Sequence, residues 1–235
     1  MKKIIWGVVG LVLGLQAGEV YATFTVEAQK SAQLAFNASG IVGNVNIDIG
    51  SVVKENEILA TLESDDINAS LQLAKTQFKY AKKDFERQLK VKHLVDQESL
   101  DQYANKYESA KDQVILQQAL FDKTILKAPF EGIIFWKELE VGDTVSGALL
   151  RTVLKLQSLH ARKLVLSFDQ KYWKEIKVGD TFSYKLDGDS RQYEGKILKV
   201  YPSADANNRK MQAEVHAKDL PVGLFGDGLI TTQMK

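Results

Sequence analysis

The sequence has 235 residues, no cysteine and a formal net charge of +1 at pH 7. The lack of cysteine excludes disulfides, thiol catalysis and cysteine-ligated metal sites, and the nearly neutral charge gives no general reason to bind nucleic acid. With 45% apolar and 26% charged residues, the chain has a globular composition and room for one sizeable domain or about two to three small ones.

The N-terminus has the pattern of a secretory signal peptide. Two lysines precede an apolar run from Ile4 to Leu15, and Val20-Tyr21-Ala22 supplies a small-residue cleavage pattern. We therefore predict a signal peptide over residues 1–22, followed by an N-terminal segment over residues 23–33. An uncleaved membrane anchor is the alternative, although a helix as long as the apolar run spans only about 18 Å, less than a bilayer core.

Residues 34–64 predict short strands separated by glycine. Apolar and polar residues alternate over residues 45–50, which is the period of a β-strand. Gly40 and Gly50 stand where turns need a positive φ, so we expect both to be structural turn residues.

Two long helical patterns follow, within residues 65–124. The apolar positions recur at alternating spacings of three and four, as in a coiled coil. In the first pattern they are Ile67, Leu71, Ala74, Phe78, Ala81, Phe85 and Leu89. In the second they are Leu100, Tyr103, Tyr107, Ala110, Val114 and Phe121, and the polar Gln117 completes the spacing. The flanks carry many lysines, so we predict an antiparallel α-helical hairpin about 40 Å long that projects into solvent. An ordinary helix pair packed on a globular core is the alternative.

Residues 125–158 repeat the rhythm of residues 34–64. Two stretches of the first segment have counterparts in the second. Ser39-Gly40-Ile41-Val42 corresponds to Glu131-Gly132-Ile133-Ile134, and Asp48-Ile49-Gly50-Ser51-Val52-Val53 corresponds to Glu140-Val141-Gly142-Asp143-Thr144-Val145. Gly132 and Gly142 are accordingly predicted to be structural turn residues like their counterparts. The repeat predicts that the two segments form one domain.

From residue 159 to residue 235 the pattern changes to five or six short strands separated by glycine and aspartate turns, with one short helix over Asp169–Ile176. Such a series predicts a small closed β-barrel.

No arrangement of residues in the sequence indicates catalysis. His93, His160 and His216 fall in three different predicted elements, and none has a second ligand at metal-binding spacing. The adjacent acids Asp65-Asp66 are explained by the dipole of the helix that they begin. We therefore predict no enzyme activity, no metal site and no cofactor.

The two β-rich halves resemble a biotinyl/lipoyl carrier domain. In carrier domains the halves meet at a tight turn that bears the modified lysine, but here Asp66 stands at that place and the helical hairpin fills the turn. Together with the stretch Leu126–Ile134 and with Val141-Gly142-Asp143-Thr144-Val145, this arrangement resembles the periplasmic adaptors, or membrane fusion proteins, of haemolysin-D type. The resemblance implies a mostly β fold. It would combine a lipoyl-like β-sandwich (34–64 and 125–158), an α-helical coiled-coil hairpin (65–124) that splits it, and a β-barrel (159–235).

The resemblance also implies a function. Such a chain would be the periplasmic adaptor of a tripartite efflux or export system in a Gram-negative envelope, associated with the inner membrane. Its partners would be an inner-membrane efflux transporter, an outer-membrane channel protein and further copies of itself in a hexameric ring, with no nucleic acid. We take a proton-driven transporter of the resistance-nodulation-division (RND) type as the first choice and an ATP-driven ABC exporter as the alternative. A carrier or scaffold protein, or a secreted coiled-coil binder, would be functions outside transport.

The tip of the hairpin carries the expected channel contacts. Many pump adaptors have an Arg, Leu, Ser pattern there, and the resemblance carries it over to Arg87 and Leu94, with Asp96 where the serine is expected. For Arg87, a solvated residue on the flank of the helix is the alternative interpretation.

Overall fold

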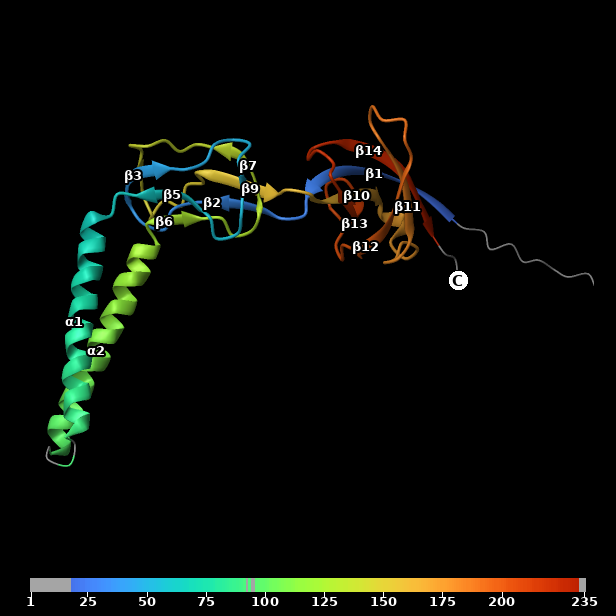
Figure 1. The fold of residues 1–235 in the computed structure, drawn as a ribbon. Helices are drawn as coiled ribbons and strands as arrows, with labels where there is room; N and C mark the ends of the chain where they lie inside the picture. Colours follow the sequence, from blue (N-terminus) through green and yellow to red (C-terminus); the bar gives the residue numbers. More distant parts are fainter. Residues whose placement is uncertain (1–17, 92, 94–95, 233–235) are drawn as a thin grey trace, which may run out of the picture. The chain divides into compact units, whose positions relative to one another are not determined.

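Figure 1 shows the fold in a computed structural model, which describes residues 18–91, 93 and 96–232. The chain divides into two compact units. One comprises residues 30–159, and in the other residues 18–29 join residues 160–232. Residues 1–17 of the predicted signal peptide lie outside the described residues. Neither helix of the described chain combines the length and the apolarity needed to cross a membrane.

The unit of residues 30–159 contains two four-stranded sheets. In the first the strand order is β2 (Ser31–Leu34), β9 (Leu154–Ser158), β7 (Gly132–Lys137) and β4 (Val52–Val53). In the second it is β6 (Ile125–Lys127), β5 (Ile58–Leu62), β3 (Gly40–Val45) and β8 (Thr144–Val145). Both sheets contribute to one apolar core, in which Leu59, Ile134 and Leu156 are completely buried. The two β-rich segments therefore close on each other as one sandwich, as the sequence predicted.

The internal repeat is visible in the hydrogen bonds between the halves. Strand β4 of the first half pairs with β7 of the second, and β8 of the second half pairs with β3 of the first. The amide of Gly50 donates to the carbonyl of Ile134 at 2.8 Å, and the corresponding amide of Gly142 donates to the carbonyl of Val42 at 2.8 Å. Each half thus supplies the same contact to the other, which explains why the same motif occurs twice.

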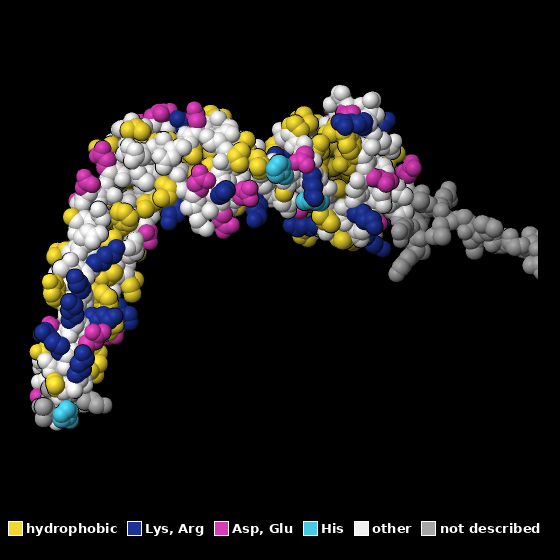
Figure 2. Space-filling model, in the orientation of Figure 1, with side chains coloured by type: hydrophobic (Ala, Val, Ile, Leu, Met, Phe, Trp, Pro, Cys, Tyr) yellow, Lys and Arg dark blue, Asp and Glu magenta, His cyan; other side chains and the backbone are white. Residues whose placement is uncertain are grey.

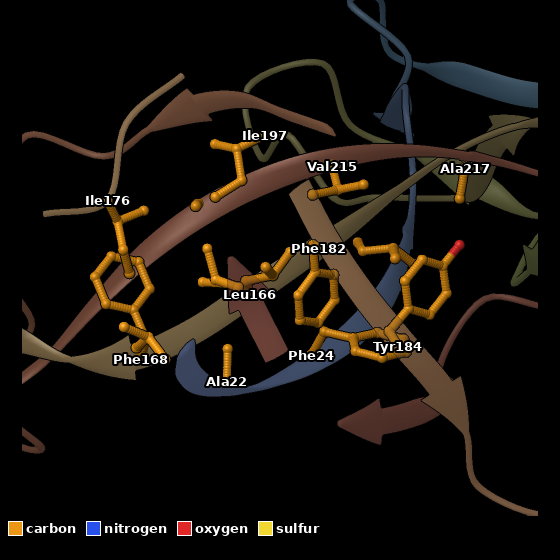
Figure 3. Packing of buried hydrophobic residues seen from close by; sticks show 14 of the residues in the cluster. Ala22, Phe24, Leu166, Phe168, Ile176, Phe182, Tyr184, Ile197, Val215 and Ala217 are labelled. Atoms are coloured by element: carbon orange, nitrogen blue, oxygen red, sulfur yellow. The ribbon is translucent and has the colours of Figure 1, made fainter. Parts of the chain in front are cut away.

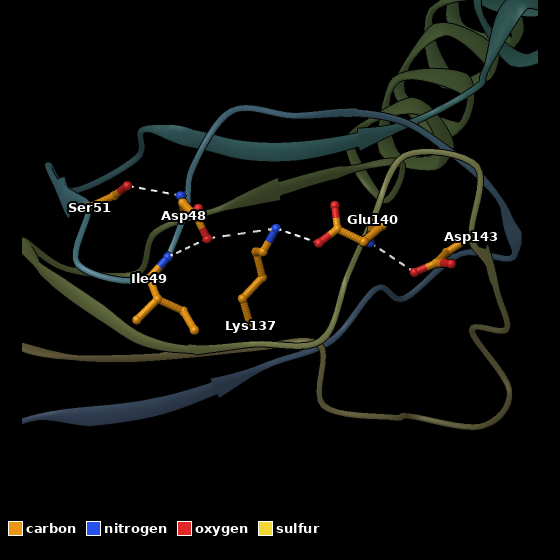
Figure 4. A network of polar contacts seen from close by, with 6 residues as sticks. All are labelled: Asp48, Ile49, Ser51, Lys137, Glu140 and Asp143. Carbon is orange, nitrogen blue, oxygen red and sulfur yellow. Dashed lines mark hydrogen bonds and ion pairs between the residues drawn. The ribbon is translucent and has the colours of Figure 1, made fainter.

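Lys137 connects the turns of the two halves (Figure 4). Its ammonium group lies 2.7 Å from the carboxylate of Glu140 and 3.8 Å from that of Asp48, and only 14% of its side chain is exposed. The hydrogen bond to Glu140 raises the pKa of Lys137. The two turns are held by similar hydrogen bonds. The backbone amide of Asp48 donates to the hydroxyl of Ser51 at 2.9 Å, and the backbone amide of Glu140 donates to the carboxylate of Asp143 at 2.8 Å.

The four glycines predicted as turn residues fall into two groups. Gly50 and Gly142 have φ angles of +89° and +93°, and a Cβ at either would meet nothing within 4 Å. These two are turn glycines, selected by backbone conformation. The prediction was wrong for Gly40 and Gly132, which begin strands β3 and β7 and have no positive φ. At Gly132 the constraint is a close approach, because a Cβ would lie 2.2 Å from the carbonyl oxygen of Gln157.

The second unit is a closed barrel with the strand order β1-β10-β13-β12-β11-β14. The strands are β1 (Gly18–Ala28), β10 (Ala161–Asp169), β11 (Thr181–Leu186), β12 (Tyr193–Val200), β13 (Lys210–Lys218) and β14 (Phe225–Thr232). Inward-facing residues alternate along the strands and fill the interior (Figure 3). Aromatic rings are prominent in this core, where the ring centres of Phe24 and Tyr184 are 5.1 Å apart in an edge-to-face contact.

Strand β1 corrects the predicted N-terminal boundaries. It runs through the predicted cleavage position, and Val20 and Ala22 are buried in the barrel core at 1% and 0% exposure. The predicted segment 23–33 is also not a unit, because its first part belongs to the barrel and β2 belongs to the sandwich. Between β10 and β11 the predicted helix Asp169–Ile176 is reduced to the 3-10 turn η1 (Gln170–Tyr172).

Candidate functional site: the helical hairpin

The hairpin is inserted at a turn of the sandwich. It consists of α1 (Asp65–Lys90) and α2 (Gln97–Asp122), and it connects the paired strands β5 and β6. The amide of Leu62 donates to the carbonyl of Thr124 at 2.9 Å, which closes the base of the insertion. Asp66 lies in the first turn of α1, so a helix start occupies the place where a carrier domain would present its lysine.

An aromatic seam joins the two helices. The ring of Tyr107 on α2 stacks on Phe78 and on Phe85 of α1, with ring centres 5.6 and 5.5 Å apart. Leu71 and Ala74 are the buried residues of α1, and none of the described residues of α2 is buried. Each helix therefore packs chiefly on the other, and the rest of its surface stays open to solvent, as expected for a hairpin that does not lie in a globular core.

The open surface of the hairpin is partly apolar, which the sequence reasoning did not single out. Yellow apolar side chains lie among the dark-blue cationic ones along the hairpin in Figure 2. The most exposed of them are Leu73, Tyr80, Ile115 and Leu116, each more than half exposed. A signal was present in α2, where apolar residues occur on more than one side of the helix.

At the tip, the structure describes two of the three predicted contact residues. The guanidinium of Arg87 forms an ion pair with Asp84, one turn earlier on α1, and its side chain is 74% exposed. Asp96 is the N-cap of α2, where its carboxylate accepts hydrogen bonds from the amide and the hydroxyl of Ser99, both at 2.8 Å. Leu94 lies outside the described residues. The geometry thus shows that Asp96 caps helix α2, while its role in partner binding stays a prediction.

The N-cap at Asp96 should make the stability of the first turn of α2 depend on pH. The hydrogen bonds from Ser99 lower the pKa of Asp96 below its ordinary value of 3.8. A lowered folded-state pKa means that the cap contributes fully above pH 3.8 and is lost as the pH falls through the folded-state pKa. We expect Asp96→Ala to speed amide hydrogen exchange in the first turn of α2 about fivefold at neutral pH, as loss of an N-cap does.

Asp96→Asn is the matched control, because asparagine also caps helices but does not titrate. It should preserve the protection at neutral pH and remove the loss of protection on acidification. Equal exchange rates in the alanine variant and the unaltered chain would contradict the capping role.

Residues 18–91, 93 and 96–232 contain no group of three or more His, Asp or Glu placed to hold a metal ion. His160 forms a 2.7 Å contact with Asp219 in the barrel unit, and Met211 is buried in the barrel core. Long exposed helices with mixed apolar and charged surfaces are suited to packing against other helices.

Solved structures share this architecture. A crystal structure of a MacA–MexA chimeric protein, which contains the Pseudomonas aeruginosa MexA α-hairpin domain, matches with a TM-score of 0.83 and 18% identity over 92% of this chain and 82% of that chain. The membrane fusion protein Spr0693 from Streptococcus pneumoniae R6 matches with a TM-score of 0.73 and 14% identity, over 92% of this chain and 100% of that chain. A crystal structure of a putative efflux transporter from Bacteroides eggerthii matches with a TM-score of 0.70 and 17% identity, over 93% of this chain and 70% of that chain. At these identities the likeness establishes the fold.

Sequence comparison identifies the family. No curated protein matches the chain. The family model described as the CzcB-like, barrel-sandwich hybrid domain matches residues 30–150, which is more than half of the chain. This range contains the inserted hairpin and all strands of the sandwich except β9, which follows at Leu154–Ser158. The chain therefore belongs to the CzcB-like barrel-sandwich hybrid family, and so to the periplasmic adaptors, or membrane fusion proteins.

Proposed function

We propose that this chain is the adaptor subunit of a tripartite efflux system in a Gram-negative envelope. It would lie in the periplasm in association with the inner membrane and connect an inner-membrane transporter to an outer-membrane channel, as one of several copies in a ring. The observation that carries the proposal is the hairpin, about 40 Å long, inserted at the β5–β6 turn of the sandwich with its flanks exposed. An exposed helical tip of this kind can pack into a groove between partner helices.

The transporter class is the finer part of the proposal. We take an RND-type transporter as the working partner and an ABC-type exporter as the alternative. A carrier role outside transport has less support, because Asp66 and the first turn of α1 replace the turn that would bear a modified lysine.

The proposal is tested by affinity purification of the tagged chain from membranes in mild detergent, after cross-linking in the cell. We expect an inner-membrane transporter and an outer-membrane channel in the eluate, identified by mass spectrometry, and the transporter found there decides between the RND and ABC types. Recovery of the chain without either membrane protein would refute the adaptor function.

The tip prediction is tested in the same purification with Arg87→Glu. If Arg87 contacts the channel, reversing its charge should reduce the recovered channel about tenfold, as loss of a strong interface residue does. The transporter should be retained, because the substitution lies at the opposite end of α1 from the sandwich.

Lys82→Glu is the control for that substitution. It makes the same charge change on the same helix, at a residue whose contact with Glu86 is a 3.9 Å exposed ion pair, and it should leave channel recovery unchanged. Undiminished recovery with Arg87→Glu would remove Arg87 from the channel contact.

A further inference from the structure

One loop of the barrel unit presents a tryptophan among lysines to the solvent. The loop follows β10, extends over residues 170–179 and includes η1. Its charged residues, all of them exposed, are Lys171, Lys174, Glu175 and Lys177. Three positive charges therefore stand against one negative charge. Trp173, in the middle of this group, is 59% exposed, which leaves much of a large apolar ring open to water.

The loop is anchored so that Trp173 faces outward. Ile176 is only 3% exposed and points into the barrel core toward Phe168 (Figure 3). The carboxylate of Asp180, which is itself buried, accepts a hydrogen bond from the amide of Lys177 at 2.7 Å. Because these contacts fix the loop in advance, little conformational entropy is lost when Trp173 meets a partner.

Two further exposed apolar residues adjoin the loop. The amide of Gly179 donates to the carbonyl of Ile197 in β12 at 2.8 Å. This hydrogen bond brings Val178 beside Leu198, and their side chains are 65% and 58% exposed. The loop and the neighbouring part of β12 thus expose apolar side chains next to positive charges.

The loop lysines are available to an anionic partner. Among the described residues of the barrel unit, none of the three forms an ion pair. The ammonium groups of Lys171 and Lys174 instead lie 4.8 and 5.1 Å from the ring centres of Tyr172 and Trp173. Such contacts leave the positive charges unneutralised.

The loop lies at the end of the barrel where the chain enters it. Ala22 of β1 pairs with Phe168 of β10 in antiparallel register, so the start of β1 and the end of β10 are at the same end. In the sequence only two residues separate Gly18 from the apolar run Ile4–Leu15. If that run is kept as a membrane anchor, the alternative to a cleaved signal peptide, this end of the barrel is the one next to the bilayer.

We infer that this loop is a lipid-binding surface, which rests in the headgroup region of a membrane that contains anionic lipids. Tryptophan favours the boundary between headgroups and acyl chains, and lysines beside it are attracted to anionic lipids. Val178 and Leu198 add apolar surface at the same level. A bilayer matches both features at once, because it offers negative charge above an apolar layer. The inference rests on the part of the proposed function that places the chain at the inner membrane, and it names the residues that contact lipid.

Tryptophan fluorescence tests this contact. Trp6→Phe and Trp136→Phe leave Trp173 as the only tryptophan of the full chain. The protein is reconstituted into vesicles of phosphatidylglycerol and phosphatidylcholine, the latter brominated on its acyl chains to quench indole fluorescence. We expect Trp173 to be quenched at least about threefold more than Trp136 in the matched protein with Trp6→Phe and Trp173→Phe, because Trp173 is placed at the interface.

Charge reversal tests the part of the lysines. In the protein with Trp173 alone, Lys171→Glu with Lys174→Glu should reduce the quenching about threefold, because anionic lipids would then repel the loop. Lys185→Glu with Lys218→Glu is the matched control. It makes the same charge change at exposed lysines of the same barrel, near the opposite ends of β11 and β13, and it should leave the quenching unchanged.

The inference would be overturned if Trp173 were quenched no more than Trp136, or if both pairs of charge reversals had the same effect. A photo-cross-linking residue at position 173 that captures a membrane protein in cells, without quenching by lipid in vesicles, would assign the loop to a protein partner and would also overturn it. Failure of the proposed function has a separate signature. In that case lipid would still quench Trp173 in vesicles, although neither transporter nor channel is recovered with the chain.

Discussion

A chain that begins at Thr23 is expected to lose the closed barrel, while a chain that begins at Gly18 should keep it. Removing residues 18–22 deletes five of the eight residue pairs between β1 and β14, from Gly18 with Thr232 to Ala22 with Gly228. It also removes the buried side chains of Val20 and Ala22. The lost burial and strand hydrogen bonds together cost about 5 kcal/mol, which is comparable with the whole stability of a small domain.

Amide hydrogen exchange of β14 and β10 measures this effect. In the chain from Thr23 the β14 amides should exchange with little protection, because the barrel is open at that strand. The chain from Gly18 with Tyr21→Ser is the control, since Tyr21 is 59% exposed and its loss should change the stability by less than about 0.5 kcal/mol. Equal protection of β14 in both shortened chains would contradict the structural role of residues 18–22.

This result also bears on the predicted signal peptide. Cleavage after Ala22 would produce the chain that begins at Thr23, with β1 cut near its middle. We therefore expect any cleavage to fall before Gly18, which leaves the strand intact.

The second large effect is expected from Gly132→Ala in strand β7. The new methyl group would lie 2.2 Å from the carbonyl oxygen of Gln157 and 3.0 Å from Leu156 Cδ1. The backbone has little freedom to move, because Gly132 is paired with Ser158 in the register of β7 and β9. We expect a loss of about 3 kcal/mol, at the upper end of overpacking effects, seen as a lower urea midpoint with an unchanged slope.

The internal repeat supplies the control. Gly40 is the counterpart of Gly132 and also begins a strand without a positive φ. A Cβ there would first meet Leu62 Cδ1 at 3.3 Å, which is the flexible end of a side chain. Gly40→Ala should therefore change the stability by less than about 1 kcal/mol. Similar losses for the two variants would show that the close approach at Gln157 is not what selects glycine at position 132.

The helical hairpin could be predicted from the sequence because the pattern that specifies each helix lies within a few neighbouring residues. Apolar residues at spacings of three and four are sufficient to predict each helix and its seam, and two such helices with a short connection must turn back on each other. The aromatic residues Phe78, Phe85 and Tyr107 were predicted on the seam, and they meet there in the structure.

Strand β1 shows where local reasoning failed. Val20, Ala22, Phe24 and Val26 alternate at the period of a strand, and all four are buried. That signal overlaps the end of an apolar run and the small-residue pattern Val20-Tyr21-Ala22, which together indicated a cleavage site. The prediction assigned residues 18–22 to the signal peptide. The strand could not be distinguished locally, because its partners β10 and β14 lie far along the chain.

The sequence by itself determined the two helices, the repeated half-motifs of the sandwich and the family to which the chain belongs. All three depend on residues close together in the chain or on a motif that occurs twice. Only the tertiary structure decided that β1 closes the barrel and that Gly132 is constrained by Gln157 while Gly50 is constrained by its own φ angle. The physical reason is that strands are stabilised by hydrogen bonds and burial against partners distant in sequence, whereas helices make their hydrogen bonds within a few residues.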